Sequence, residues 1–203
     1  MSSHLSAWNS DYCSRGRLWA GRVHGLPDLP APSAVLELGC GNGKTLGCMP
    51  AGWQVTALDM SLEALHLCRR SVPKAELILA DARALPFQDE SFDAVFAFHV
   101  TGHLPGPGRR ALAREAARVL ASGGRLFFRE FGLEDMRAGQ GEEVEPGTFR
   151  RGSGIITHYF AKAEVEELFL GMKPLFVGTQ RWKLRIKGDD LVRCEVDAVF
   201  LKI

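Results

Sequence analysis

The stretch VLELGCGNGKT, residues 35–45, decides the fold of this chain. Residues 34–38 form a short apolar run, and Gly39, Gly41 and Gly43 follow it at alternate positions. An apolar run that ends at glycine is typical of a buried strand entering a sharp turn. Because glycine has no Cβ, such a turn can bring its backbone amides close to a ligand. The stretch therefore predicts a central strand followed by a ligand-binding loop.

A carboxylate at the end of the next apolar run indicates a nucleoside ligand. Asp59 ends the run 54–58 and lies twenty residues after Gly39, where a carboxylate can accept both hydroxyls of a ribose. Dinucleotide-binding loops have the pattern G-x-G-x-x-G, whereas this loop has G-x-G-x-G and follows Glu37. Glu37 would repel a pyrophosphate but could serve a nearby aminoacyl ammonium group. The spacing therefore disfavours a nicotinamide oxidoreductase.

Strand and helix patterns alternate along the rest of the chain. Ser61 can cap one helix, and further helices are predicted at 108–120, ended by Ser-Gly-Gly at 122–124, and at 162–170. The predicted strands are 34–38, 54–58, 76–80, 92–100, 125–131, 175–187 and 191–201. This alternation predicts a doubly wound α/β sheet.

Length and composition fit one domain. The 203 residues, 46% of them hydrophobic, are enough for one buried core, which we assign to residues 34–203 after a lead-in of residues 1–33. The net charge of +1 neither demands nor excludes nucleic acid. Five cysteines without a C-x-x-C pair favour a reduced, cytoplasmic setting. No apolar run approaches the roughly 18 residues that span a membrane, so no membrane association is expected.

In the glycine loop and the strand ends that follow it, the chain resembles the class I methyltransferases, which use S-adenosylmethionine (SAM) and release S-adenosylhomocysteine. The resemblance rests on the E-x-G-C-G-x-G loop, the strand-ending Asp59 and the later pair Asp81-Ala82, and it covers residues 35–131. It implies a Rossmann-like, mostly parallel seven-stranded sheet with an antiparallel last strand, and no metal. The cofactor-binding residues that it implies are Glu37, Gly39, Cys40, Gly41, Asn42, Gly43, Asp59, Met60, Asp81, Ala82 and His99.

The C-terminal half is similar to the methyltransferase-like enzymes that make 3-methylcytidine in tRNA. The matching stretches are FREFGLEDMR at 128–137, FRRGSG at 149–154, HYF at 158–160 and FLK at 200–202, although that family's basic aromatic stretch F-F-K-D-R is absent. The likeness implies N-methylation of a tRNA base. The residues that it suggests for positioning the acceptor are Arg129, Glu130 and Asp135, and those for binding the substrate are Arg150, Arg151, His158 and Tyr159.

Each of these polar residues has an ordinary structural alternative. Arg129 and Glu130 could pair with each other or cap neighbouring elements, and Tyr159 could belong to the core. The cations of the run 181–187 alternate with Trp182, Leu184 and Ile186, so a strand would carry them on one face. That face is either a solvated surface or an RNA-binding stripe.

Two other functions remain open on the sequence. Trp8, Tyr12 and Trp19 precede the first strand with no obvious strand or long helix to hold them, and they could form a mobile lid over a metabolite. The chain would then be a small-molecule methyltransferase. A non-catalytic SAM-fold subunit is less favoured, because a degenerate domain could lose its glycine loop freely. A partner subunit is compatible with the sequence but is not indicated by it.

Overall fold

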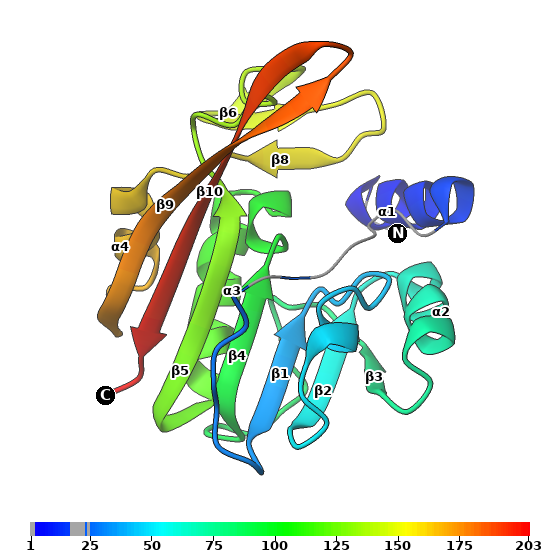
Figure 1. The fold of residues 1–203 in the computed structure, drawn as a ribbon. Coiled ribbons are helices and arrows are strands. Elements are labelled where there is room, and N and C mark those ends of the chain that lie inside the picture. Colours follow the sequence, from blue (N-terminus) through cyan, green and yellow to red (C-terminus); the bar gives the residue numbers. More distant parts are fainter. Residues whose placement is uncertain (1–2, 17–22, 24) are drawn as a thin grey trace.

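A seven-stranded sheet forms the centre of the molecule (Figure 1) in the computed structural model, which describes residues 3–16, 23 and 25–203. The strand order is β3-β2-β1-β4-β5-β10-β9. Six strands run parallel, and β10 is antiparallel to both of its neighbours. The strands are β1 (Ala34–Leu38), β2 (Gln54–Asp59), β3 (Glu76–Leu79), β4 (Phe92–Phe98), β5 (Leu120–Phe131), β9 (Lys173–Ile186) and β10 (Asp189–Leu201). The predicted fold class is confirmed.

Different elements cover the two faces of the sheet. On one face α3 (Gly106–Val119) and α4 (Lys162–Leu168) pack against β4, β5 and β10 in the largest hydrophobic cluster. On the other face Leu26 and Leu29 of the lead-in pack with Trp53 and Phe96. Because both faces are covered, the central strands β1 and β4 are apolar on both sides. Helix α2 (Leu62–Ser71) begins at Ser61, whose Oγ accepts the Ala64 N–H as predicted.

Strand β5 begins earlier than the sequence indicated. We expected Ser-Gly-Gly at 122–124 to separate a helix from a strand at 125–131, but β5 starts at Leu120. The glycines form an irregularity inside the strand. Phe92 pairs with Leu120 and Ala94 pairs with Arg125, so the register of β5 against β4 shifts between these two pairs. Gly123 adopts a φ of 78°, which glycine tolerates. A local bulge therefore replaced the predicted break.

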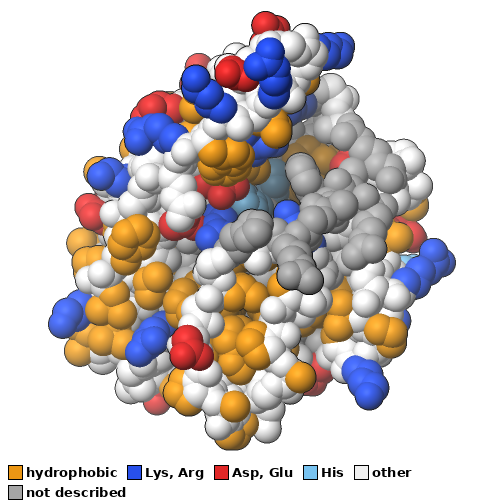
Figure 2. All heavy atoms as spheres, in the orientation of Figure 1, with side chains coloured by type: hydrophobic (Ala, Val, Ile, Leu, Met, Phe, Trp, Pro, Cys, Tyr) orange, Lys and Arg blue, Asp and Glu red, His pale blue; other side chains and the backbone are white. Residues whose placement is uncertain are grey.

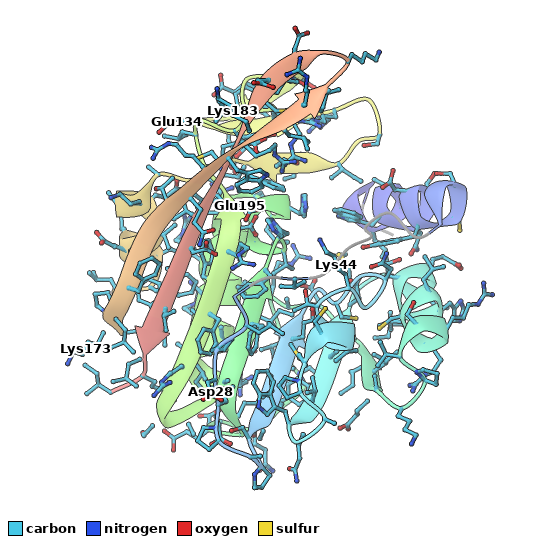
Figure 3. All side chains as sticks on the ribbon, viewed as in Figure 1. Asp28, Lys44, Glu134, Lys173, Lys183 and Glu195 are labelled. Carbon is cyan, nitrogen blue, oxygen red and sulfur yellow. The ribbon has the colours of Figure 1, made fainter. Side chains whose placement is uncertain are left out.

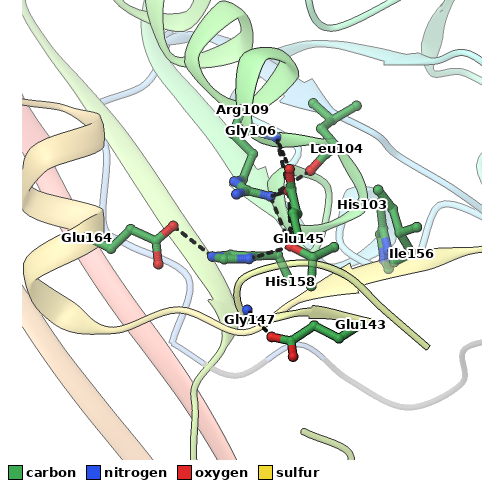
Figure 4. Close-up of polar contacts among 12 residues, drawn as sticks. His103, Leu104, Gly106, Arg109, Glu143, Glu145, Gly147, Ile156, His158 and Glu164 are labelled. Carbon is green, nitrogen blue, oxygen red and sulfur yellow. Dashed lines mark hydrogen bonds and ion pairs between the residues drawn. The ribbon is translucent and has the colours of Figure 1, made fainter. Parts of the chain in front are cut away.

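A second, three-stranded sheet was missed by the sequence patterns. It consists of β6 (Glu142–Glu145), β7 (Thr148–Arg150) and β8 (Ile156–His158) in that order. Figure 4 shows how polar side chains join it to the helices: Glu145 accepts from Arg109 at 2.7 Å, and His158 Nε2 lies 2.7 Å from Glu164 Oε1. Its strands are short and rich in charged residues, so they lack the alternation by which strands are recognised.

The hairpin of β9 and β10 extends beyond the main sheet. Residues 189–194 of β10 pair only with β9, because pairing with β5 starts at Glu195. We call residues 180–194 the arm. It continues past the carboxyl ends of the parallel strands, beside the small sheet (Figure 1).

Helix α1 (Ser3–Arg15) corrects the expectation that no long helix holds the lead-in. Its sequence is rich in serine and has no apolar stripe, so local propensity does not reveal it. Contacts hold it instead: it lies near α2, above the carboxyl ends of the strands (Figure 1), and Ser61 Oγ donates to Asn9 Oδ1 at 2.6 Å. None of the helices in the described residues is long and apolar enough to cross a membrane.

Candidate functional site

A cavity lies at the carboxyl ends of β1, β2, β3 and β4, where open parallel sheets bind their ligands. It encloses about 540 Å³ of space between atoms, including the part open to solvent. Its lining residues are Trp8, Tyr12, Gly39, Leu58, Asp59, Met60, Ala80, Asp81, Ala82, His99, Val100, His103 and Leu104.

The structure brings together six of the eleven residues that the resemblance suggested for the cofactor. Gly39, Asp59, Met60, Asp81, Ala82 and His99 line the cavity. Glu37, Cys40, Gly41, Asn42 and Gly43 lie in the adjoining strand and loop and are not among the lining residues. Sequence reasoning missed Leu58, Ala80, Val100 and Leu104, whose apolar side chains carry no signal of a site.

The glycine loop needs glycine at Gly39 and Gly41. Both have positive φ values, 67° and 52°. A Cβ on Gly39 would lie 2.7 Å from Val100 Cγ2, and a Cβ on Gly41 would lie 2.8 Å from the Tyr12 hydroxyl. The loop therefore combines a left-handed backbone with close neighbours, a combination that only glycine satisfies without strain.

Asp59 connects the loop to helix α2. Its Oδ2 accepts the Gly41 N–H at 2.9 Å, and its Oδ1 accepts the Ser61 N–H at 2.9 Å. Burial raises the pKa of Asp59, while these backbone donors oppose the rise. The Met60 N–H is a third backbone donor to this carboxylate. A carboxylate has about four lone-pair sites, so one remains for a ligand hydroxyl.

Glu37 lies fully buried behind the loop. Its Oε2 has no hydrogen-bond partner among the residues that the structure describes, and burial raises its pKa to about 8 against a hydrogen bond with Thr45. A buried acceptor without a partner is costly. A cationic donor such as the ammonium of an amino acid would satisfy it, so this residue fits the methionine end of SAM.

His99 lies at the end of the cavity next to β5 and β10. Its φ is 53°, a strained value for a residue other than glycine and one found often at functional sites. Its Nε2 lies 3.3 Å from Glu195 Oε1, and its ring packs 4.5 Å from that of Phe131. Burial opposes ionisation of Glu195, but the His99 hydrogen bond and nearby arginines hold its pKa below the usual range. No local sequence pattern points to Glu195, because only the pairing of β10 with β5 brings it here.

Arg129 and Asp135, two of the three residues proposed to position the acceptor, form ion pairs with other residues of the chain. Arg129 pairs with Asp197, its direct partner across the β5–β10 ladder. Asp135 accepts from Arg137 at 2.9 Å and from Arg193 at 2.6 Å, and its side chain is 0% exposed. Neither lines the cavity. Both form ion pairs, Arg129 with Asp197 of β10 and Asp135 with Arg137 and Arg193, and their role in positioning the acceptor stays a prediction.

Glu130, the third, supports the loop that carries His99. It is buried, and its Oε1 accepts the Gly102 N–H at 2.8 Å. Its Oε2 lies 4.0 Å from His99 Nδ1. Burial raises the pKa of Glu130 to about 8, while backbone donors of residues 100–102 oppose the rise. Glu130 thus acts on the cavity through the loop after β4 and does not line the cavity itself.

The raised pKa of Glu130 predicts a pH-dependent stability. Between the ordinary value of 4.5 and about 8 the folded chain holds a proton on Glu130 that the unfolded chain has lost. Stability should therefore fall by roughly 1 to 4 kcal/mol as pH rises through this window. Glu130→Gln, which is neutral throughout, should flatten the decline in the free energy of unfolding measured by urea denaturation. An unchanged decline would show that Glu130 is ionised in the folded chain at neutral pH.

The residues proposed for binding the substrate lie in and around the small sheet. Tyr159 is 1% exposed, and its hydroxyl accepts from Arg151 at 3.1 Å. His158 lies between Thr148 and Glu164 at 2.7 Å from each. Arg150 is exposed and pairs with Glu142. None of these four residues lines the cavity. Arg151, His158 and Tyr159 make contacts within and around the small sheet, and the assignment of all four residues to substrate binding stays a prediction.

Two of the three aromatic residues proposed as a lid reach the cavity. Tyr12 is 7% exposed and faces Gly41, and Trp8 stacks on Tyr12 with ring centroids 5.7 Å apart. The other edge of Trp8 meets His103, whose Nδ1 lies 2.8 Å from the Ile156 carbonyl oxygen. Trp19 lies outside the described residues. Helix α1 thus forms the wall opposite the strand ends.

Comparison with known proteins agrees with this geometry. Residues 36–128 match a family model described as a methyltransferase domain. Over 86% of its length the chain superimposes on a SAM-dependent methyltransferase from Methanosarcina mazei, with a TM-score of 0.70, 25% identity and 94% of that chain covered.

Curated relatives include enzymes with very different acceptors. The 27-O-demethylrifamycin SV methyltransferase of Amycolatopsis mediterranei is 34% identical over 137 residues, which cover 61% of this chain and 48% of the relative. The tRNA (carboxymethyluridine(34)-5-O)-methyltransferase of Arabidopsis thaliana is 38% identical over 110 residues, covering 54% and 26%. The chain thus spans less than half of the length of either relative.

Proposed function

We propose that this chain, a methyltransferase domain of the class I fold with SAM as its cofactor, transfers the methyl group to a small-molecule acceptor beside His99 and Trp8. The observation that carries the proposal is the enclosure of the cavity by Trp8 and Tyr12 of α1. An aromatic wall of this kind suits a ligand that is surrounded by protein. A base within a folded tRNA would have to leave its stack to enter such a cavity.

The residues at the strand ends have distinct tasks in this proposal. Asp59 binds the ribose hydroxyls, Asp81-Ala82 contacts the adenine, and Glu37 stabilises the ammonium of the methionine end. Bound SAM would supply a methyl group carried on a positively charged sulfur, and the sulfur is the leaving group, as a neutral thioether. The chain's own contribution is to hold the acceptor in line with that methyl group, and positioning alone can supply much of the rate.

His99 and its neighbours would orient the acceptor. Glu195 fixes the imidazole ring from β10, and Glu130 holds the backbone of the loop from β5. No strong base is obligatory for an acceptor with a free lone pair. The polar groups at this end of the cavity are therefore proposed to set the acceptor's orientation.

Residues 1–33 are proposed to act as a lid on the domain formed by residues 34–203. Helix α1 contacts that domain through Trp8, Asn9 and Tyr12. Elements held by few contacts open more readily than the core. Closure over the cofactor would exclude water from the reacting groups.

The lid predicts a ligand-dependent change in hydrogen exchange. Amides of residues 3–16 should exchange more slowly when S-adenosylhomocysteine is added, because the ligand adds contacts beneath Tyr12 and Trp8. The amides of residues 173–194, none of which line the cavity, serve as the internal control because their exchange should not change. Equal exchange of residues 3–16 with and without the ligand would reject the lid.

A tRNA base is the second candidate for the acceptor. The tRNA-modifying relative and the C-terminal stretches similar to the 3-methylcytidine enzymes favour it. Against it, Arg181 pairs with Glu134 and Arg185 with Asp190, so part of the basic run is already neutralised. Phosphate binding relies on cations that can release counterions.

Locating the transferred methyl group distinguishes the two candidates. The chain would be incubated with methyl-labelled SAM and, in parallel, a metabolite extract and total unmodified tRNA. Label in the low-molecular-mass fraction alone supports the small-molecule acceptor. Label in tRNA that depends on the chain would overturn this proposal in favour of the second candidate.

A further inference from the structure

The arm carries an apolar strip on one face. Trp182, Leu184 and Ile186 alternate along β9 and are 41%, 40% and 36% exposed. Leu191 of β10 lies directly opposite Leu184, and residues opposite one another in an antiparallel pair share a face. We call these four residues the strip. The cations Arg181, Lys183 and Arg185 occupy the other face.

The strip lies beyond the His99 end of the cavity, on the same face of the hairpin. The same face of the hairpin continues through the pair Arg193–Trp182 to the pair Glu195–Gln180, and Glu195 touches His99. Side-chain contacts follow this path: Phe131 lies 4.5 Å from the His99 ring, and Arg193 lies 5.0 Å from Phe131 and 5.7 Å from Trp182. Figure 3 labels Glu195 near the point where the arm leaves the main sheet and Lys183 further along the arm.

The space-filling view agrees with this path. In Figure 2 hydrophobic side chains lie on the arm next to the hollow in which histidine atoms are visible. Along a strand each residue adds about 3.3 Å, so the span from Glu195 to Leu191 is roughly 13 Å. Exposed apolar patches that are rimmed by polar residues mark interaction sites or ligand-binding grooves, and this one lies on the face of the hairpin that leads to the cavity.

We propose that the strip binds the apolar body of an elongated methyl acceptor whose reacting end reaches His99. The inference rests on the proposed function and names its substrate class: a molecule with a polar, methyl-accepting end and a hydrophobic body longer than about 13 Å. Trp182 and Leu184 contact that body, and Arg193 closes the gap between it and the cavity.

An apolar occupant matches the chemistry of this face better than RNA does. A nucleic acid backbone requires cations, and on the arm Arg181 and Arg185 point to the opposite face and are paired. On the strip's own face Arg193 is committed to Asp135 at 2.6 Å. What this face offers a ligand is hydrophobic contact.

Chain-length dependence of binding tests the proposal. Phenols with linear alkyl chains of increasing length, below their micelle concentrations, would be titrated calorimetrically into the chain saturated with S-adenosylhomocysteine. Affinity should rise about twofold for each added methylene, below the roughly fourfold expected for complete burial. The paired variant Trp182→Ser with Leu184→Ser should remove this rise.

A matched control lies on the other face of the arm. Val192 is 39% exposed and pairs with Lys183, so Val192→Ser is the counterpart of the single variant Leu184→Ser on the opposite face and should leave the chain-length dependence intact. Each variant should bind S-adenosylhomocysteine with the affinity of the parent, which shows that it is folded. If the double variant Trp182→Ser with Leu184→Ser fails this check, the single variant Leu184→Ser takes its place.

The outcomes separate this inference from the function on which it rests. Affinity that is independent of chain length, or a dependence equal in parent and strip variants, overturns the strip as a binding site. A concentration-dependent dimer abolished by Trp182→Ser would also overturn it, because a second copy would then cover the face. Failure of the parent to bind S-adenosylhomocysteine would instead reject the cofactor assignment itself.

Discussion

Gly41→Val should reduce the affinity for SAM at least about 100-fold. Position 41 has a φ of 52°, and a Cβ there would lie 2.8 Å from the Tyr12 hydroxyl. A left-handed conformation costs a residue with a Cβ about 1 to 2 kcal/mol, and a β-branched side chain adds a clash with α1. The loop can relieve the strain and the clash only by moving away from α1 and from the position that would bind SAM, and we expect this displacement to cost at least the roughly 2.8 kcal/mol that corresponds to a 100-fold loss. Isothermal titration of SAM into the purified variant measures the effect.

Gly123→Val is the matched control for backbone strain. Gly123 has a φ of 78°, but a Cβ there would meet nothing within 4 Å. The control should lose stability by an amount similar to the strain term at position 41, while its SAM affinity stays that of the parent. SAM binding by Gly41→Val at parental affinity would mean that the loop does not contact the cofactor.

Asp59→Ala should weaken SAM binding about 5- to 150-fold. This range corresponds to roughly 1 to 3 kcal/mol, the scale for losing hydrogen bonds to a charged group. The variant loses the acceptor for ribose and also leaves the N–H groups of Gly41 and Ser61 without their partner. Calorimetry would again give the dissociation constant.

Asp93→Ala separates the loss of the ribose acceptor from the loss of carboxylate-to-backbone hydrogen bonds. Asp93 Oδ2 accepts the Ala34 N–H at 2.8 Å, at the end of β1 away from the cavity. Its removal should cost stability through the same kind of lost carboxylate-to-backbone hydrogen bond, but it should leave SAM affinity unchanged. If Asp59→Ala remained folded and bound SAM like the parent, the ribose assignment would be wrong.

The parts of the fold that the sequence predicted are those with strong local signals. Strand β1 and its glycine turn combine an apolar run with three glycines, and Ser61 is a favourable cap at the start of α2. The doubly wound α/β class follows from the alternation of strands and helices, because crossover connections restrict the arrangement. Asp59, Asp81 and His99 could be predicted at one edge because each follows a strand.

The parts that the sequence could not predict depend on long-range contacts. Helix α1 is held by Trp8, Tyr12 and Asn9 against residues far along the chain. The ion pairs of Arg129 with Asp197 and of Asp135 with Arg193 could not be predicted from local patterns, because both partners lie on β10. The pairing of β10 with β5 also places Glu195 beside His99. Tertiary contacts, rather than propensity, decided these roles.

The most direct test of the SAM assignment is a calorimetric titration of the purified chain with SAM, with NADH as the comparison. The site predicts saturable binding of SAM at one site per chain and no binding of NADH, because the loop lacks the glycine spacing for a pyrophosphate and carries Glu37 behind it. Saturable binding of NADH, or no heat on addition of SAM to the folded chain, would contradict the assignment.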